Sequence, residues 1–206
     1  IGHKYVANVM KSLGLKSRTV KKYKATTNSK HNLPVADNLL LRERSESEQI
    51  DVQTGKKLDK YERTFGFHQI NKAWVSDITY IATDEGWLYL AGIMDLCGKE
   101  LVGWSMKDRM TKELVVAAFE NARRKRNSPV GVILHSDRGS QYCSKMYRGL
   151  LEKYGFRCSM SRKGNCWDNA PMESFWGKLK QEWLNGQHFR TRDEARSAVF
   201  WYIETY

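Results

Sequence analysis

Three apolar segments separated by short polar turns constrain the fold of this chain more than any other feature. Residues 73–82, 87–95 and 101–106 are rich in Trp, Val, Ile, Leu and Tyr, and the first of them alternates apolar with polar positions. These properties are typical of β-strands. Because the turns are only a few residues long, neighbouring strands must run antiparallel. The sequence therefore predicts a three-stranded antiparallel meander.

Helices and single strands alternate after this meander. Helical spacing of apolar positions, or a capping residue before them, predicts four helices, over residues 111–126, 144–154, a stretch that starts at Asp168 or Asn169, and 192–206. Short apolar runs predict two more strands, at 130–134 and 156–161. The predicted order β-β-β-α-β-α-β-α-α indicates an α/β domain with five strands.

The first 64 residues differ in composition from the rest. Residues 1–34 contain eight Lys or Arg and no Asp or Glu, and apolar positions from Tyr5 to Leu13 have helical spacing. We interpret 1–34 as one helix and a basic tail, either a remnant of a helical DNA-binding domain or a solvated tether. Residues 35–64 are polar and charge-mixed, which predicts a linker or surface excursion with at most one short helix. The expected domains are 1–34, 35–64 and a core at 65–206.

The charge balance favours a polyanionic partner. The chain has 35 Lys and Arg against 23 Asp and Glu, a formal net charge of +12. Nucleic acid is the first candidate for such a surface, although solubility alone is an alternative explanation. Within the basic tail, Lys21 and Lys22 are candidate DNA contacts. Because the chain starts without Met and stops inside an apolar helical pattern, we expect it to be part of a longer protein.

Other features of the composition exclude several classes of protein. The four cysteines form no CxxC pair and no His pair completes a zinc set, so free thiols in a reducing cytoplasm are expected. We expect no signal peptide, and no apolar run approaches the roughly 20 residues that span a bilayer. We therefore expect a cytoplasmic protein with no membrane partner.

Three carboxylates stand out by their positions on the predicted elements. Asp77 lies in the middle of the first strand, Asp137 follows the fourth strand, and Glu173 falls in the first turn of the third helix. If the first and fourth strands are neighbours, both aspartates can reach one point, and the helix brings in the glutamate. Three acids at one site would raise one another's pKa values unless a cation neutralised them. Ligation by oxygen alone suits Mg²⁺ or Mn²⁺, and two such ions can drive in-line phosphoryl transfer.

Four other acids compete with this set for the metal site, namely Asp84, Asp95, Asp168 and Glu182. Asp84 lies in a turn, and Asp168 is a candidate helix cap. Asp95, at the end of the second strand, is the strongest alternative to Asp77. Position alone does not decide between these sets.

Four sequence strings carry a resemblance to a known family: WVSDITYI, DEGWLYLAGIMDL, HSDRGSQYCS and SMSRKGNCWDNAPMESFWGKLKQE. From Trp74 to Tyr206 the chain resembles the catalytic core of insertion-sequence transposases of the IS-three family, part of the retroviral-integrase superfamily. The resemblance implies an RNase H-like fold, a mixed five-stranded sheet flanked by helices. It also implies that the family's Asp, Asp, 35-residue spacer, Glu triad falls on Asp77, Asp137 and Glu173. Lys180, two helical turns after the glutamate, is implied to hold a phosphate.

The function implied by this resemblance is DNA transposition. Two Mg²⁺ or Mn²⁺ ions would free a 3′-OH at the element end, and that hydroxyl would attack a second phosphodiester. The implied partners are terminal inverted repeats and target DNA, bound by at least a dimer in the bacterial cytoplasm, associated with the nucleoid. The alternatives are a metal-dependent nuclease of the same fold, which cuts without joining, and an inactive DNA-binding protein. The intact triad argues against the inactive protein.

Several polar residues near the acids are candidate DNA contacts. His135 and Arg138 flank Asp137, and Arg162, Lys163 and Asn169 precede the helix of Glu173. Four of these residues have an alternative role. The histidine could instead satisfy the strand end, and the other three could belong to a solvated loop.

Overall fold

A mixed five-stranded sheet forms the body of the protein. The computed structural model describes residues 2–15, 31–43, 57, 61–63, 67–162 and 169–205. The strands are β3 (Ala73–Thr83), β4 (Gly86–Asp95), β5 (Leu101–Lys107), β6 (Ile133–Ser136) and β7 (Arg157–Met160). They lie in the order β5-β4-β3-β6-β7. The β3–β4 and β4–β5 pairs are antiparallel, whereas β6 is parallel to β3 and to β7. The predicted meander and mixed sheet are confirmed.

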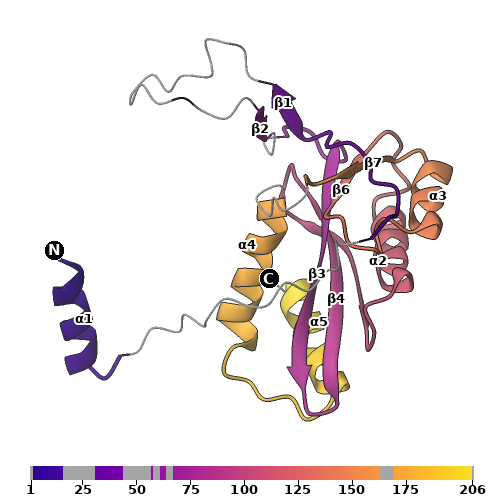
Figure 1. The fold of residues 1–206 in the computed structure, drawn as a ribbon. Helices are drawn as coiled ribbons and strands as arrows, with labels where there is room; N and C mark the ends of the chain where they lie inside the picture. The colour runs from indigo at the N-terminus through magenta and orange to yellow at the C-terminus, as the bar shows by residue number, and fades with distance from the viewer. Residues whose placement is uncertain are drawn as a thin grey trace.

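Helices cover both faces of this sheet (Figure 1). One face carries α2 (Lys112–Lys125) and α3 (Lys145–Lys153). The other carries α4 (Ala170–Lys178), the π-helix η3 (Leu179–Leu184) that continues it, and α5 (Arg192–Thr205). Alternation along β3 explains the two cores, because successive side chains point to opposite faces. Trp74 and Ile78 pack with α2 and α3, while Val75 and Ile81 pack with the other helices.

The order of elements agrees with the prediction, and the largest difference lies at β6. The strand predicted over residues 130–134 begins at Ile133 and continues to Ser136. Val130 is 78% exposed, and Gly131 has a φ of 75°, a left-handed backbone conformation that favours glycine. The residues before Ile133 therefore form a turn. This shift places Asp137 directly after the last residue of the strand.

The N-terminal helix α1 (His3–Ser12) forms as predicted but contributes nothing to either core. None of its residues is buried, and Tyr5 and Leu13 are about two-thirds exposed. Figure 1 shows it apart from the sheet. Lys21 and Lys22 lie outside the described residues, so both interpretations of the N-terminal region stay open. No helix in the described parts of the chain has the length and apolar character needed to cross a membrane.

Residues 31–40, which we call the edge segment, run beside the outer edge of β7. The Met160 amide donates to the Asp37 carbonyl at 3.2 Å, and the Leu39 amide donates to Ser159 Oγ at 2.9 Å. Leu40 is buried in the core. Part of the region expected to be a linker therefore packs against the sheet, while the expected domain limits stay a prediction.

Two short strands follow the edge segment. They are β1 (Leu41–Glu43) and β2 (Tyr61–Arg63), which pair antiparallel. Where the structure describes residues 35–64, it shows these strands and no helix, so the expected short helix is absent from that part.

Candidate active site

Asp77 and Asp137 lie at equivalent positions of two neighbouring strands, Asp77 within β3 and Asp137 directly after β6. Because β3 and β6 are parallel and Val75 pairs with His135, the two aspartates follow at equivalent positions two residues later. The turn after β6 is held by Asp137 itself, whose Oδ1 accepts a hydrogen bond from the Gly139 amide at 2.8 Å. Ligand sites in α/β sheets commonly lie at the carboxyl end of a strand, and here β6 ends beside the middle of β3.

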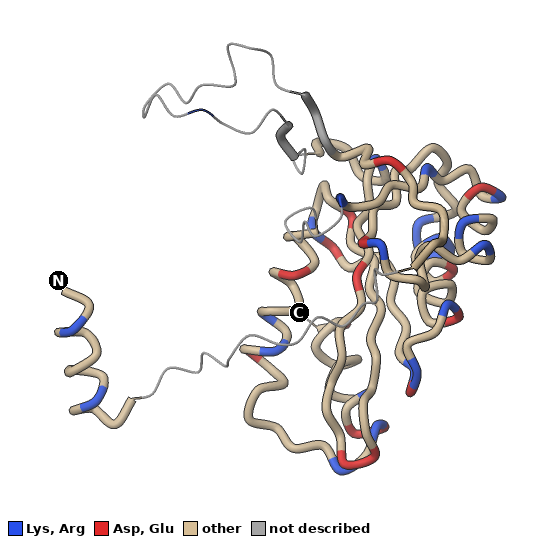
Figure 2. The backbone as a smooth tube through the Cα atoms, in the orientation of Figure 1, with Lys and Arg blue, Asp and Glu red and all other residues tan. Residues whose placement is uncertain are grey.

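Helix α4 brings Glu173 to the same side of the sheet. One turn after Glu173, the indole Nε1–H of Trp176 donates to Asp77 Oδ2 at 3.1 Å, which ties α4 to β3. Further along, in η3, the Lys180 ammonium lies 4.8 Å from the centroid of the Tyr80 ring on β3. Figure 2 shows acidic positions on the upper part of α4 and on the segments beside it.

The surroundings of the site disfavour the charged forms of Asp77 and Glu173. Loss of hydration on burial, together with the charges of Asp137 and Glu173, raises the pKa of Asp77 from 3.8 to about 8, against hydrogen bonds from Ile78 and Trp176 that lower it. Burial also raises the pKa of Glu173. Burial lowers the pKa of Lys180, and attraction to Asp77 opposes that effect. Asp77 alone would therefore be largely protonated at neutral pH.

The chemical type of the three candidate ligands suits a hard cation. All three candidate ligands are carboxylates, and a cation beside Asp77 would favour its charged form. As the side chains stand, no three His, Cys, Asp or Glu among the described residues are close enough together to hold a metal ion. Convergence of the three acids on metal thus stays a prediction.

The strongest competitor of Asp77 has a structural role instead. Asp95 is buried, and its two oxygens accept from the Asn71 amide, the Trp74 indole and the Cys97 amide. Three N–H donors satisfy this carboxylate inside the core, which leaves it no open face for a metal.

Two of the other competing acids are exposed and have partners. Asp84 contacts His188 at 2.8 Å, and Glu182 accepts from the Tyr202 hydroxyl at 2.8 Å. Asp168 lies outside the described residues.

Two of the expected DNA contacts are buried. The His135 side chain is fully enclosed, with Nδ1 2.8 Å from Ser159 Oγ and Nε2 3.1 Å from Ser161 Oγ. Asn169, at 4% exposure, donates through Nδ2 to the Ser76 carbonyl at 3.2 Å. The contacts of His135 fit the alternative role at the strand end. Direct DNA contact by either side chain stays a prediction.

Arg138 and Arg162 lie where DNA contact is possible. Both are partly exposed and line a pocket of about 550 Å³ together with residues 35–38 of the edge segment. Arg138 Nε donates to the Ser161 carbonyl at 2.6 Å, and the Arg138 carbonyl lies 2.8 Å from His31 Nε2. Lys163 lies outside the described residues.

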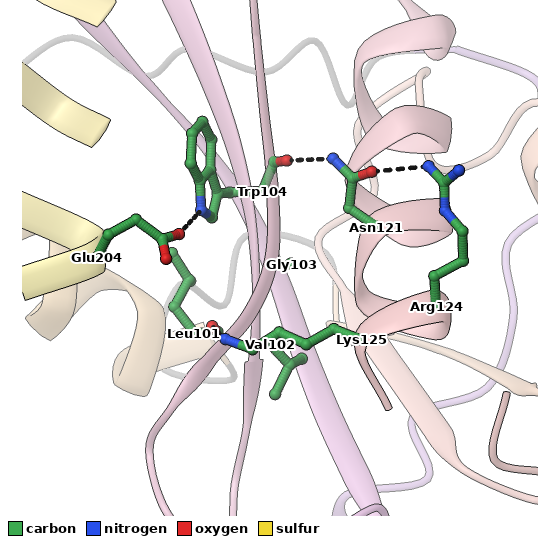
Figure 3. A pocket seen from close by; sticks show the side chains of 8 residues that line it. All are labelled: Leu101, Val102, Gly103, Trp104, Asn121, Arg124, Lys125 and Glu204. Carbon is green, nitrogen blue, oxygen red and sulfur yellow. Dashed lines mark hydrogen bonds between the residues drawn. The ribbon is translucent and has the colours of Figure 1, made fainter. Parts of the chain in front are cut away.

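A second pocket, of about 340 Å³, lies between β5, α2 and α5 (Figure 3). Its polar groups bond to one another: Asn121 donates to the Trp104 carbonyl, and Arg124 donates to Asn121 Oδ1. Because β5 is the far edge strand of the sheet, this pocket is separate from the acids.

Sequence reasoning missed the contact between Trp176 and Asp77. The periodicity of α4 assigned Trp176 to the core, and the side chain is indeed 5% exposed. The only signal in the sequence was its spacing of three residues after Glu173, which puts both side chains on one side of a helix.

Comparison with known proteins gives consistent similarities. The family described as Integrase core domain matches residues 68–166, and a second family of the same description matches 154–206. The chain is 48% identical over 206 residues to an uncharacterized 31 kDa protein of insertion element IS600 from Shigella sonnei, covering 100% of this chain and 68% of that protein. It is 41% identical over 201 residues to transposase InsF of insertion sequence IS3A from Escherichia coli K12, covering 98% and 62%. The chain thus spans about two thirds of these relatives.

A solved structure shares the fold. It is the simian T-cell lymphotropic virus intasome in complex with PP2A regulatory subunit B56 gamma, with a TM-score of 0.54 and 14% identity. The alignment covers 85% of this chain and 54% of that one. At this identity the likeness shows the fold alone, which is the RNase H-like fold expected from the sequence.

Proposed function

Because this chain belongs to the IS3 family of insertion-sequence transposases and carries an integrase core domain, we propose that its acid site cleaves and joins DNA at insertion-sequence ends. The observation that carries the proposal is the placement of Asp77 within β3 and Asp137 directly after β6 at equivalent positions of neighbouring parallel strands, beside the helix of Glu173. The raised pKa of Asp77 supports it, because a cation is what such a carboxylate lacks.

Each residue of the site has a proposed role. Asp77, Asp137 and Glu173 would hold two Mg²⁺ or Mn²⁺ ions, which supply activation of the attacking oxygen and stabilisation of the leaving oxygen. Lys180 places a positive charge beside the acids, where it can contact a phosphate. Arg138 and Arg162 extend this positive charge along the neighbouring pocket.

The proposed partners are DNA and further copies of the protein. The substrates would be the terminal inverted repeats and the target DNA, bound by at least a dimer on the bacterial nucleoid. The net charge of +12 supports a DNA partner. Because phosphate contacts release counterions, binding should weaken steeply with salt.

A strand-transfer assay with pre-cut element ends tests the proposal on the full-length protein. Asp137→Asn should abolish cleavage and joining, while DNA binding is retained or strengthened because local negative charge falls. Asp84→Asn is the matched control, since Asp84 is exposed in the turn after β3, and it should keep activity.

Three outcomes separate the alternatives in this assay. Activity that survives Asp137→Asn would contradict the assignment of the site. Hydrolysis by the wild type without joined product would favour the nuclease. DNA binding without either reaction would favour the inactive DNA-binding protein.

A further inference from the structure

We propose that Trp176 is a positioning residue for Asp77, and that Gly92 provides the space in which its indole ring reaches that carboxylate. The inference rests on the proposed function, in which Asp77 binds a divalent cation. It adds a residue that binds no metal and touches no substrate, but sets the orientation of one that does.

The hydrogen bond is well placed for this role. Trp176 Nε1 lies 3.1 Å from Asp77 Oδ2, and the Trp176 side chain is 5% exposed, so water competes weakly for the donor. The indole is a donor only and carries no charge, so it orients a carboxylate without competing for the metal. A second donor, the Ile78 amide, also bonds to Asp77.

Gly92 makes the approach of the ring possible. In the β3–β4 register Gly92 lies directly opposite Asp77. A Cβ atom at this position would lie 2.7 Å from Trp176 Cη2, a distance that real Cβ contacts essentially never show, and 3.0 Å from Cζ2, which is tighter than nine in ten such contacts. The indole therefore crosses β4 in the space that a side chain at Gly92 would fill, and its N–H reaches the neighbouring strand.

The same contact sets the position of α4. Glu173 precedes Trp176 by one turn on this helix, so a ring packed on Gly92 and bonded to Asp77 also places the turn that carries the glutamate. Hydrogen-bond partners of metal ligands typically contribute 10–100-fold to metal affinity. We therefore expect the loss of this one N–H to have an effect of about that size.

The chain contains its own matched control. Trp74 Nε1 donates to Asp95 Oδ2 at 3.2 Å, another tryptophan–aspartate bond on the same sheet. Asp95 is satisfied by three donors and lies outside the proposed metal site. Trp74→Phe thus removes the same type of bond without changing a contact of the three proposed metal ligands.

The experiment measures Mg²⁺ alone, without DNA, on the full-length protein. Calorimetry gives the Mg²⁺ affinity, and ¹H–¹⁵N NMR follows the indole N–H signals. In the wild type the Trp176 signal should shift on addition of Mg²⁺. Trp176→Phe should weaken Mg²⁺ binding by about 10–100-fold. Trp74→Phe should leave the affinity within about twofold, because its bond serves only the fold.

A double-mutant cycle with Gly92→Ala tests the role of the glycine. Alone, the added methyl should displace the indole and weaken Mg²⁺ binding as Trp176→Phe does. In the Trp176→Phe background the smaller ring leaves room, so Gly92→Ala should add little further loss. Losses of Mg²⁺ affinity that do not add indicate that both substitutions act through the same contact. Losses that add would mean that they disturb the fold independently.

The failures of the two proposals are distinguishable. If Asp77→Asn removes Mg²⁺ binding but Trp176→Phe keeps wild-type affinity, the positioning inference is overturned and the proposed function stands. The inference is also overturned if the wild type binds Mg²⁺ but the Trp176 indole signal does not shift. This result does not depend on whether Trp176→Phe folds. Absence of any Mg²⁺ binding that depends on Asp77 overturns both.

Discussion

At the scale of single residues, hydrogen-bond partners separate acids that have the same apparent placement in the sequence. Asp77 and Asp95 both lie in strands of the meander, yet three N–H donors satisfy the Asp95 carboxylate inside the core. Asp77 accepts fewer hydrogen bonds, and burial together with the charges of two neighbouring acids raises its pKa to about 8. Perturbed carboxylates of this kind gather at functional sites, because burial that costs stability persists where it serves chemistry.

Asp77→Asn should change how stability depends on pH. The pKa of Asp77 is raised from 3.8 to about 8 in the folded protein, so the folded state binds more protons than the unfolded state between these values. The free energy of unfolding therefore falls as pH rises through this window. Because asparagine does not titrate, Asp77→Asn should remove this fall in the free energy of unfolding. At pH 8 without divalent ions we expect the variant to be more stable by about 1–3 kcal/mol, less than full linkage because the side chain keeps some contact with water.

Urea unfolding at pH 5 and pH 8 measures this effect. Asp84→Asn is the control, because Asp84 is exposed and its replacement should leave the pH dependence unchanged. Equal pH dependence of the wild type and Asp77→Asn would contradict the raised pKa.

At the scale of elements, α4 and η3 form one helical rod that changes its winding halfway. The rod is α-helical through Lys178 and π-helical over Leu179–Leu184. π-helical turns are rare in proteins overall, and those that occur are often located at functional sites. Here the change occurs at the turn that carries Lys180, beside Tyr80 and within the influence of Asp77.

Lys180→Gln should weaken DNA binding through loss of one phosphate contact. We expect the slope of log affinity against log salt to fall by about 1, uniformly across DNA sequences. Fluorescence anisotropy with labelled DNA over a range of salt concentrations measures the slope. Lys178→Gln, an exposed neighbour on the same rod, is the control. The same slope for wild type and Lys180→Gln would remove Lys180 from the DNA surface.

Close packing of β5 on α2 depends on a second glycine. A Cβ atom on Gly103 would lie 2.4 Å from the Ala122 backbone nitrogen, and backbone cannot move aside as a flexible side chain can. Gly103→Ala should therefore destabilise the protein by about 1–3 kcal/mol or more. Chemical denaturation measures the loss.

Gly149→Ala provides the comparison for this variant. Gly149 lies within α3 with nothing near its missing Cβ, so alanine there should stabilise the helix by about 0.5–1 kcal/mol. Loss of stability in both variants would mean that the close approach at Gly103 is not the cause.

At the scale of the whole molecule, segments far apart in the sequence complete the core around the acids. The edge segment contacts β7 and the turn after Asp137, through Asp37 and His31. The core of α4 and α5 also includes Leu40, from the polar region expected to be a linker. Residues before the sheet are thus part of its folding unit.

Leu40→Ala should destabilise the whole core if this packing is correct. Leu40 is 2% exposed, and replacement of a buried leucine by alanine typically costs about 2–5 kcal/mol. Leu33→Ala, at a position 39% exposed in the same segment, should change stability by less than about 0.5 kcal/mol. Thermal unfolding compares the two. If Leu40→Ala were as stable as Leu33→Ala and the wild type, the edge segment would be dispensable for the fold.

The sequence by itself determined the order of elements, the placement of the three acids and the basic character of the surface. Periodicity, capping residues and turns act over a few residues, so they can be read without a structure. The β6 boundary was shifted by a glycine turn whose backbone conformation the apolar run did not reveal.

Only the tertiary structure decided which strands are neighbours and what each polar side chain contacts. The pairing of β6 with β3, the contacts of His135 with one serine in β7 and one directly after it, and the hydrogen bond from Trp176 to Asp77 all join residues far apart in the chain. Such contacts depend on how layers pack against each other, and a local pattern carries no information about the partner on the facing layer.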